Sequence, residues 1–430
     1  MRNHHARRLL AAAAALALAP AAASAQVSLS PRGLGMGGAD LGLARGAQAL
    51  FANPANLGLH GNTYWSVAVP QFAAGADFGG LGLGDLKSLM HTRRLTDADR
   101  ARIMGLIPES GVSSTVDIRV PMLVIQNRRF ALGVAYGSVV KQAVGRDIFD
   151  LMINGYQDGR TDYSVGNTAG SRASYVDVAA AFGHKLGPVS LGVTGHWLHG
   201  RTLVQSRLFE PRYDLEKNDI QAEYREVLAH GGSGYSVDVG AAAEPAKGLV
   251  LSAAVANLSS RLTWTQDLDT KSLILDRNSF RASDFQQIWT RLDQSEQRVD
   301  PGAVPVTVYE TARGLYDGAF LPATLRAGAS YTRGATALAA SYQGALTTGR
   351  LSGQWRRQLG VGAERKVAFT TLRAGFASDL GSARMLTGGI TLGPITVGLG
   401  RTSGTTAEGA HASGWMGSFG LSTGTTGLMP

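Results

Sequence analysis

The chain has 430 residues, of which 56 are glycine and none is cysteine. Glycine is about twice as frequent as usual, and charged residues make up 17% against a usual share of about 25%. The lack of cysteine excludes a disulfide scaffold, thiolate metal ligands and thiol catalysis. A hydrophobic share of 44% excludes a disordered chain.

Residues 1–25 have the three parts of a secretory signal peptide. Three arginines at positions 2, 7 and 8 precede an Ala/Leu-rich stretch, and Ala23-Ser24-Ala25 forms an A-x-A cleavage site. The alternative is a transmembrane anchor, but about 15 apolar residues are fewer than the ~20 needed to span a bilayer. Cleavage leaves 38 basic and 32 acidic residues, a net charge of +6. Because these charges are dispersed, we expect no nucleic-acid partner.

Most of the remaining chain alternates between bulky apolar and small or polar residues. Phe130, Leu132, Val134 and Tyr136 share one parity, for example, and the residues between them are Ala and Gly. A soluble sandwich and a lipid-facing barrel both produce such strands. The small residues of the second face and strand lengths of about 10 residues favour a transmembrane barrel.

The alternation divides into about 14 strands, an even number that suits a bacterial outer-membrane barrel. The last strand is expected to end near Phe419, followed by a tail. The predicted strands cover 63–72, 114–126, 128–140, 173–186, 188–205, 233–245, 248–265, 322–333, 335–344, 351–364, 367–378, 384–393, 394–403 and 412–422.

The longer polar connections are 84–113, 141–171, 206–232 and 266–321, and two of them contain helix signals. Thr96 is an expected N-cap for a helix that includes 101–107. A second helix over 283–292 has an apolar stripe that includes Phe285, Ile288 and Trp289. This stripe is expected either to pack on the barrel or to bind a protein partner.

The N-terminal stretch is rich in glycine and contains an Asn-Pro-Ala motif at Asn53, Pro54 and Ala55. Gly33, Gly35 and Gly38 satisfy the dinucleotide pattern G-x-G-x-x-G. However, no convincing strand precedes them and no acidic residue lies about 20 residues further on, so we exclude that function.

The run RGLGMGGADLGLARGAQALFANPANLGL resembles the N-terminal signature of the FadL/PorV superfamily of outer-membrane barrels. Weaker similarity to one branch of that superfamily continues at 94–107, 233–258, 321–331, 360–376 and 384–400. The resemblance implies an all-β, transmembrane antiparallel barrel of about 14 strands with an N-terminal plug, or hatch, and a few short helices. The implied domains are a hatch over 26–62, a barrel over 63–422 and a tail over 423–430.

The hatch supplies the candidate site residues, which are Gly33, Gly35, Gly37, Gly38, Asn53, Pro54 and Ala55. Glycine allows backbone to approach a barrel wall closely, and Pro54 forces Asn53 out of the helical region. Two interpretations remain open: a purely structural turn and anchor, or a gate on a ligand path.

We identify no catalytic residues, no cofactor site and no metal site. The histidines are scattered, and His196 and His199 are expected on opposite faces of a strand. The acidic residues over 214–226 alternate with basic ones and are expected to form a solvated loop. The tryptophans at 65, 197, 264, 355 and 415 fall in predicted strands, where either aromatic girdles or core packing explains them.

These observations predict a protein of the bacterial outer membrane, in contact with its lipid. The first hypothesis is a passive transport channel for hydrophobic or amphipathic small molecules. The alternative is a PorV-like scaffold or accessory protein of an envelope or secretion complex, with Phe285, Ile288 and Trp289 as contacts to a protein partner. An enzyme is disfavoured because no nucleophile and base can be paired.

Overall fold

A computed structural model of the chain describes residues 30–77, 96–107, 109, 111–154, 160, 163–164, 168–209, 212–214, 219–276, 285–298, 321–347, 357–381, 383–405 and 411–425. The predicted signal peptide and the last five residues lie outside these ranges. Within them, no helix combines the length and the apolarity needed to cross a membrane.

Fourteen long strands dominate the described chain, and each contains or overlaps one of the predicted segments. The first seven are β1 (Trp65–Asp77), β2 (Val112–Asn127), β3 (Phe130–Val144), β4 (Ala169–Leu186), β5 (Val189–Leu208), β7 (Asp219–Ala246) and β8 (Leu249–Leu275). The other seven are β10 (Thr324–Arg333), β11 (Thr336–Ala345), β12 (Arg357–Val367), β13 (Thr370–Ser378), β14 (Arg384–Leu392), β15 (Ile395–Thr405) and β16 (His411–Thr425).

The strands close into a barrel. Neighbours pair antiparallel in chain order, with β5 beside β7 and β8 beside β10, and β16 pairs with β1. The short strands β6 (Arg212–Asp214) and β9 (Gln297–Arg298) attach to β7 and β8 outside this ring. The ring confirms the predicted 14-stranded antiparallel barrel, because the pairing of β16 with β1 closes the sheet on itself.

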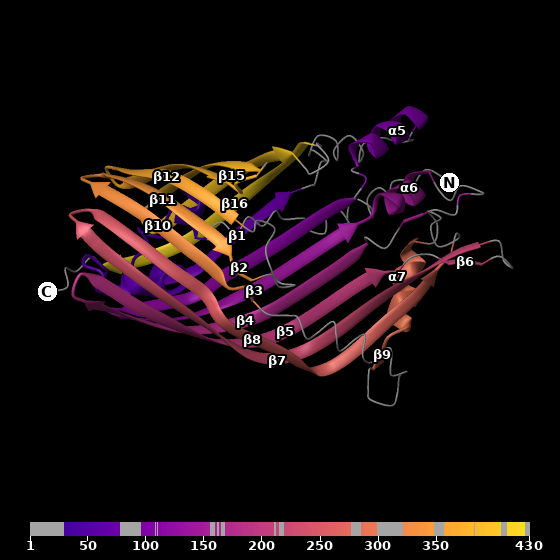
Figure 1. Cartoon of the computed structure of the whole chain (residues 1–430), viewed down its shortest axis with the longest axis horizontal. Helices are drawn as coiled ribbons and strands as arrows, with labels where there is room; N and C mark the ends of the chain where they lie inside the picture. The colour runs from indigo at the N-terminus through magenta and orange to yellow at the C-terminus, as the bar shows by residue number, and fades with distance from the viewer. Residues whose placement is uncertain are drawn as a thin grey trace.

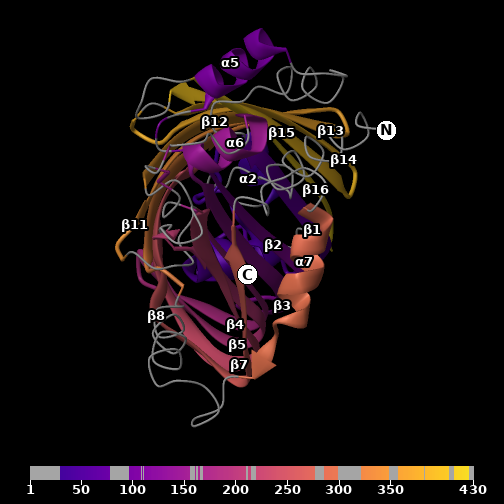
Figure 2. The same ribbon diagram turned by 90° about the vertical axis from the view of Figure 1, so that its right-hand side faces the viewer.

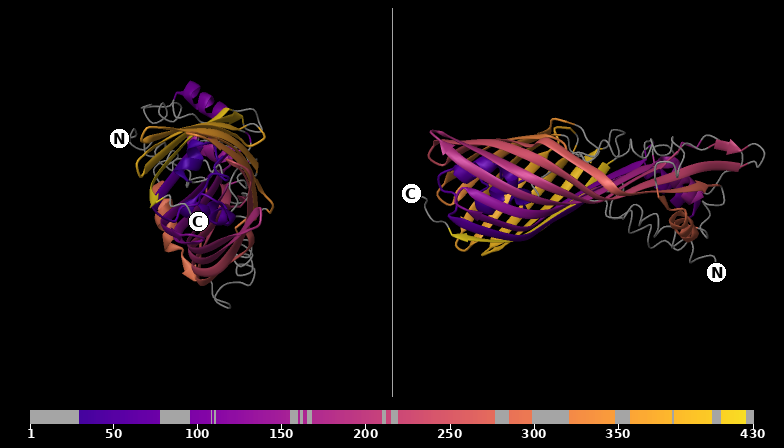
Figure 3. Two further views of the ribbon diagram at one scale, coloured as in Figure 1. Left: turned by 90° about the vertical axis from the view of Figure 1, so that its left-hand side faces the viewer. Right: turned by 90° about the horizontal axis from the view of Figure 1, so that it is seen from below.

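Strand length differs greatly around the ring. β7 has 28 residues and β8 has 27, whereas β10 and β11 have 10 each. The strands from β2 to β8 therefore project beyond the others as a twisted extension (Figures 1 and 3). The expectation of polar connections was wrong over 219–232 and 266–275, which are paired strands.

The last strand also runs further than expected. β16 continues to Thr425, and Leu421–Thr425 pair with Val69–Trp65 of β1. The Gly, Ser and Thr composition suggested a tail after Phe419, but ladder pairing uses backbone groups and tolerates small side chains. The boundary predicted at 423 therefore falls inside a strand.

The outer surface of the barrel carries the bulky apolar side chains. Phe130 and Leu132 are 63% and 57% exposed, whereas Ala131 between them is buried. This orientation is the one expected for strands whose outer face contacts lipid. Trp65, Trp197 and Trp415 are also exposed, but Trp264 is buried inside and does not belong to an outer girdle.

Three helices lie among the long connections beyond the barrel (Figures 1 and 2). α5 (Asp97–Leu106) begins with the predicted cap, because Asp99 N donates to Thr96 Oγ1 and Thr96 N donates to the Asp99 carboxylate. α7 (Phe285–Gln294) confirms the second predicted helix. α6 (Arg146–Asn154) was not anticipated; its apolar face packs on Tyr163, Leu208 and Ala222.

The N-terminal stretch Ser30–Asn62, here called the inner segment, lies within the ring of strands (Figure 3). It contains α2 (Pro31–Gly35), the 3₁₀ turn η1 (Gly46–Gln48), α3 (Ala49–Ala52) and the 3₁₀ turn η2 (Pro54–Gly58). α2 contacts β13–β16, and η2 contacts β4, β5 and β7 across the barrel. Opposite parts of the wall therefore hold opposite ends of the segment.

Candidate functional site

The candidate site is the interface between the inner segment and the barrel wall. Its glycine-rich end begins at Ser30, whose Oγ accepts a hydrogen bond from Gly33 N at 2.8 Å and caps α2. Gly37 and Gly38 then adopt φ values of 65° and 81°. These left-handed conformations turn the chain away from α2 and favour glycine.

The glycine end lies directly against backbone of the wall. A Cβ at Gly37 would lie 2.5 Å from Phe376 O, and one at Gly35 would lie 3.1 Å from the Gly389 Cα. Gly33 and Gly35 lie in α2, which contacts β13–β16, and Gly37 lies against β13. With Gly38, which follows directly, four of the predicted site residues belong to this end of the segment.

The wall has its own glycines opposite the inner segment, and sequence reasoning did not assign them. A Cβ at each would approach backbone or side-chain atoms of the segment to less than 3.0 Å, closer than real side chains come. The signal was present as glycine on the small face of each strand, but the partner of each could not be deduced. These wall glycines are Gly133, Gly183, Gly192, Gly240, Gly360, Gly362, Gly375 and Gly398.

Asn53 anchors the other end of the segment. It is fully buried and extended, with φ −155° and ψ 112°, as expected before Pro54. Its Oδ1 accepts from Ala55 N at 2.9 Å. Its Nδ2 lies 2.7 to 3.1 Å from three acceptors on β7 and β8, which are Ala241 O, Ser252 Oγ and Ala253 O.

Further polar contacts fix the backbone on both sides of Asn53. Ser190 Oγ donates to Ala55 O at 2.6 Å, and Arg326 Nη1 donates to Phe51 O at 2.8 Å. Asn53, Pro54 and Ala55 therefore lie together, as the motif implied, but across the barrel from the four glycines.

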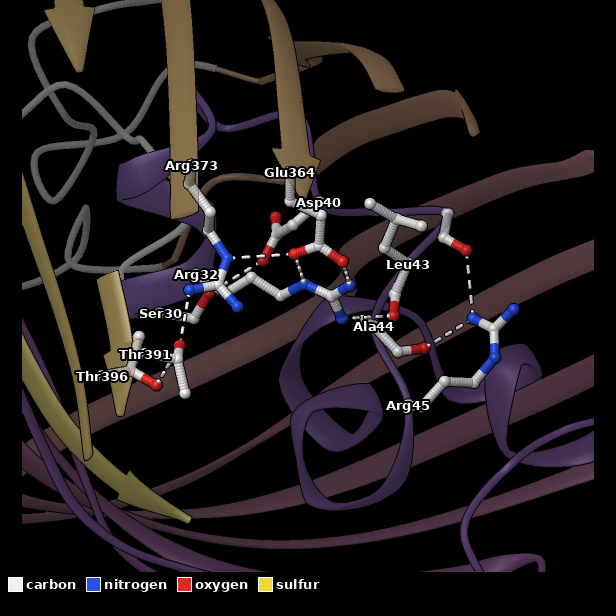
Figure 4. Close-up of polar contacts among 11 residues, drawn as sticks. Ser30, Arg32, Asp40, Leu43, Ala44, Arg45, Glu364, Arg373, Thr391 and Thr396 are labelled. Carbon is white, nitrogen blue, oxygen red and sulfur yellow. Dashed lines mark hydrogen bonds and ion pairs between the residues drawn. The ribbon is translucent and has the colours of Figure 1, made fainter. Parts of the chain in front are cut away.

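An ion cluster joins α2 to β12 and β13 (Figure 4). Glu364 accepts from Arg32 Nε at 3.1 Å and from Arg373 Nε at 3.0 Å, and it also pairs with Arg32 Nη2. Arg32 Nη1 donates to Leu43 O within the segment. The buried Asp40 carboxylate accepts from Ser30 Oγ at 2.8 Å, so two acids and two arginines occupy this part of the interface.

A second buried cluster was missed at the sequence level. His196 Nδ1 lies 2.9 Å from Asp177 Oδ1, and His196 Nε2 lies 3.3 Å from Asp238 Oδ2. One ring nitrogen faces each carboxylate, an arrangement suited to an imidazolium that donates from both. His199 is exposed, which confirms that the two histidines lie on opposite faces.

This histidine cluster adjoins the inner segment through Phe51, whose ring centroid is 6.3 Å from that of His196. Asn257 supports it from β8, where its backbone N donates to Asp238 Oδ1 at 2.7 Å and its φ is 54°. Asp177 and Asp238 each interrupt the small face of a strand with a charge. That interruption was the one signal that could have singled them out.

The partner-helix candidates Phe285, Ile288 and Trp289 lie on α7, but their side chains are outside the described part of the structure. The end of α7 is fastened to β8, because Lys271 Nζ lies 2.8 Å from Asp293 Oδ1 and 3.0 Å from Glu296 Oε2.

No family model and no curated protein matches the chain. Among solved structures, it is similar to the toluene transporter TbuX of Ralstonia pickettii, with a TM-score of 0.49 and 14% identity over 92% of this chain and 98% of that one. It is similar to the Pseudomonas putida toluene transporter TodX, with a TM-score of 0.49 and 12% identity over 91% and 96%. A Rhodopseudomonas blastica porin matches with a TM-score of 0.23 and 10% identity, over 84% of this chain and 98% of the porin. The closed ring of strands described above confirms the barrel architecture that the sequence resemblance implied.

Proposed function

We propose that this outer-membrane barrel is a passive channel for hydrophobic or amphipathic small molecules, rather than an enzyme, and that its inner segment is the gate. The observation that supports the proposal is the kind of hydrogen bond that holds the inner segment against the barrel wall. The described backbone hydrogen bonds of the inner segment are internal to it, and its bonds to the wall involve side chains. Such contacts can be released while the strand ladder stays intact.

An apolar layer supports the proposed class of cargo. On the side of the inner segment that faces the long connections, buried apolar side chains from several strands meet in one cluster. A hydrophobic solute leaves water favourably at such a layer, whereas an ion loses its hydration there. The cluster comprises Val139, Ala173, Tyr175, Leu198, Leu203, Ala229, Leu262, Trp264 and Leu321.

The proposed path starts among the long connections, crosses the apolar layer and reaches the inner segment. The segment then shifts about Asn53 and Pro54, and the solute leaves at the short-turn end. Short turns face the periplasm in bacterial outer-membrane barrels, so transport is expected to be inward.

A reversible crosslink tests whether the segment must move. A Cβ at Gly42 would lie 3.2 Å from the Ser330 Cβ, near the ~3.5–4.5 Å of a disulfide. No native cysteine competes. Cells that display the Gly42→Cys, Ser330→Cys variant should take up the hydrophobic dye N-phenylnaphthylamine slowly when oxidised and at the wild-type rate after reduction. Toluene, named as the cargo of the two similar transporters, is the second probe.

Each single-cysteine variant is the control and should respond to neither oxidant nor reductant. A hydrophilic dye should enter equally slowly in both redox states, which excludes a general leak. If the crosslinked and reduced proteins admit the hydrophobic dye at the same rate, the inner segment is not the gate.

The scaffold hypothesis is favoured by one observation, the fastening of α7 to β8 beyond the barrel. A helix held there would present a fixed surface to an envelope protein. Purification of the tagged chain with Phe285→Ala and Trp289→Ala should then lose an associated protein, and an unchanged set of associated proteins would exclude this role for α7.

A further inference from the structure

Basic side chains gather at the short-turn end of the barrel. Six short turns lie at this end, and the five that join β2 to β3, β4 to β5, β7 to β8, β10 to β11 and β12 to β13 have basic residues in or beside them. These turns and the adjoining strand ends expose seven basic residues, and Glu244 is the one exposed acid among their described residues. The seven are Arg128, Arg129, Lys185, Lys247, Arg333, Arg365 and Lys366.

The five turns that carry basic residues lie next to one another in space. Gly183 N donates to Arg129 O at 3.0 Å, which joins the first two turns. Thr332 N donates to Gly248 O and Lys366 N donates to Ala335 O, both at 2.8 Å, which joins the last three. The pairing of β5 with β7 connects the two groups. The basic residues therefore follow a continuous arc along the rim.

The charge of this arc is not balanced by the protein. Among the described residues, no carboxylate pairs with any of the seven. Arg128 Nη2 donates to Tyr64 Oη at 2.9 Å, and Arg129 Nη1 lies 2.7 Å from His184 Nδ1. At the opposite end of the barrel, by contrast, two of the arginines in the connections pair with carboxylates, Arg146 with Glu109 and Arg160 with Asp147. The rim charge is thus available to an external anion.

The arc also lies at the edge of the apolar outer surface. Arg333 shares the outward parity of Tyr331, which is 46% exposed, and Arg365 shares that of Val361. Phe369, in the turn after β12, is 82% exposed. Long basic side chains at the end of an apolar band reach toward headgroups, and aromatic rings settle at the same level.

We propose that this rim binds anionic phospholipid headgroups of the leaflet around it. Basic residues beside an anionic surface attract it, and an arc along the lipid edge brings each charge to a separate headgroup. An acidic protein would be better matched by a compact patch facing away from the bilayer. This inference does not depend on the transport function.

The preference can be measured with the whole barrel refolded into vesicles of phosphatidylcholine and phosphatidylglycerol. Quenching of its tryptophans by brominated forms of either lipid gives their relative association constant. We expect the wild type to prefer phosphatidylglycerol several-fold. In the Arg333→Gln, Arg365→Gln variant the relative association constant for phosphatidylglycerol should fall by about threefold or more. A basic residue beside an anionic membrane surface raises such a constant on the order of fivefold.

The matched control is Arg357→Gln, Arg384→Gln, which removes two exposed arginines at the other end of β12 and β14. It should retain the wild-type preference, and 0.5 M salt should weaken the preference of every form. Heat-modified mobility in gels verifies folding of each variant. The proposal is overturned if the wild type shows no preference, as an acidic protein partner would predict, or if the control pair lowers it equally.

Discussion

At the residue scale, Asn53 is the side chain on which the inner segment depends most. Asn53→Ala removes a buried amide with acceptors on two strands and the cap of η2. Losing such hydrogen bonds costs about 1–3 kcal/mol, so the segment should loosen while the barrel stays folded. Uptake of N-phenylnaphthylamine should rise, and limited proteolysis should cut within the inner segment.

Asn127→Ala changes the same residue type at an exposed strand end and should alter neither measurement. If proteolysis shows a loosened segment in Asn53→Ala without faster dye uptake, the segment closes no path. That result would favour the anchoring interpretation of the motif.

Substitutions at two glycines of β5 distinguish the effect of close packing against the inner segment from the effect of strand propensity. A Cβ at Gly192 would fall within 3.0 Å of Ala55, whereas one at Gly195 meets no atom within 4 Å. Gly192→Ala should therefore displace η2 and lower the thermal unfolding temperature, by a few degrees or more. Gly195→Ala should leave the thermal unfolding temperature unchanged or raise it slightly. Equal effects of the two changes would mean that the wall glycines do not accommodate the segment.

The same residues show what a sequence can predict at this scale. The conformation of Asn53 followed from its neighbour Pro54, because that restriction acts along the chain. The partners of Gly192 and the cluster of Asp177, His196 and Asp238 did not follow. They depend on contacts between strands and on the register of pairing, which no local rule sets.

At the element scale, the ion cluster ties α2 to the wall. Glu364 is largely buried between Arg32 and Arg373. Glu364→Gln would leave two arginines close together with one carboxylate fewer, and removing one partner of a buried pair costs about 3–5 kcal/mol. We expect α2 to detach before the barrel unfolds, seen as protease cleavage near Arg32 at lower urea than in the wild type.

Glu223→Gln is the control, since Glu223 pairs with Arg225 on the extension of β7 and is more exposed. An exposed pair contributes at most about 1 kcal/mol, so this change should leave α2 protected. Equal protection of α2 in both variants would show that the ion cluster does not hold it.

The sequence predicted where the strands lie better than it predicted how long they are. Alternation located all fourteen long strands, because one face of the strands carries exposed apolar side chains and the other faces the interior. It did not reveal 219–232 of β7, where the charged residues Glu223 and Glu226 lie on opposite faces of a paired strand. Beyond the apolar band, water on the outside removes the contrast between faces, and with it the pattern.

At the scale of the whole molecule, the outward apolar surface distinguishes a lipid-embedded barrel from a soluble one. Leu399 lies near the middle of β15 and is 58% exposed, whereas Phe369 lies in a short turn. For a barrel in a bilayer, arginine at the midplane costs about 2–4 kcal/mol and near the interface about 0–1. Leu399→Arg should therefore lower the free energy of unfolding in phosphatidylcholine vesicles far more than Phe369→Arg. In a soluble barrel both positions would already face water, and both changes would be nearly neutral; that equality would contradict the membrane assignment, whatever the channel carries.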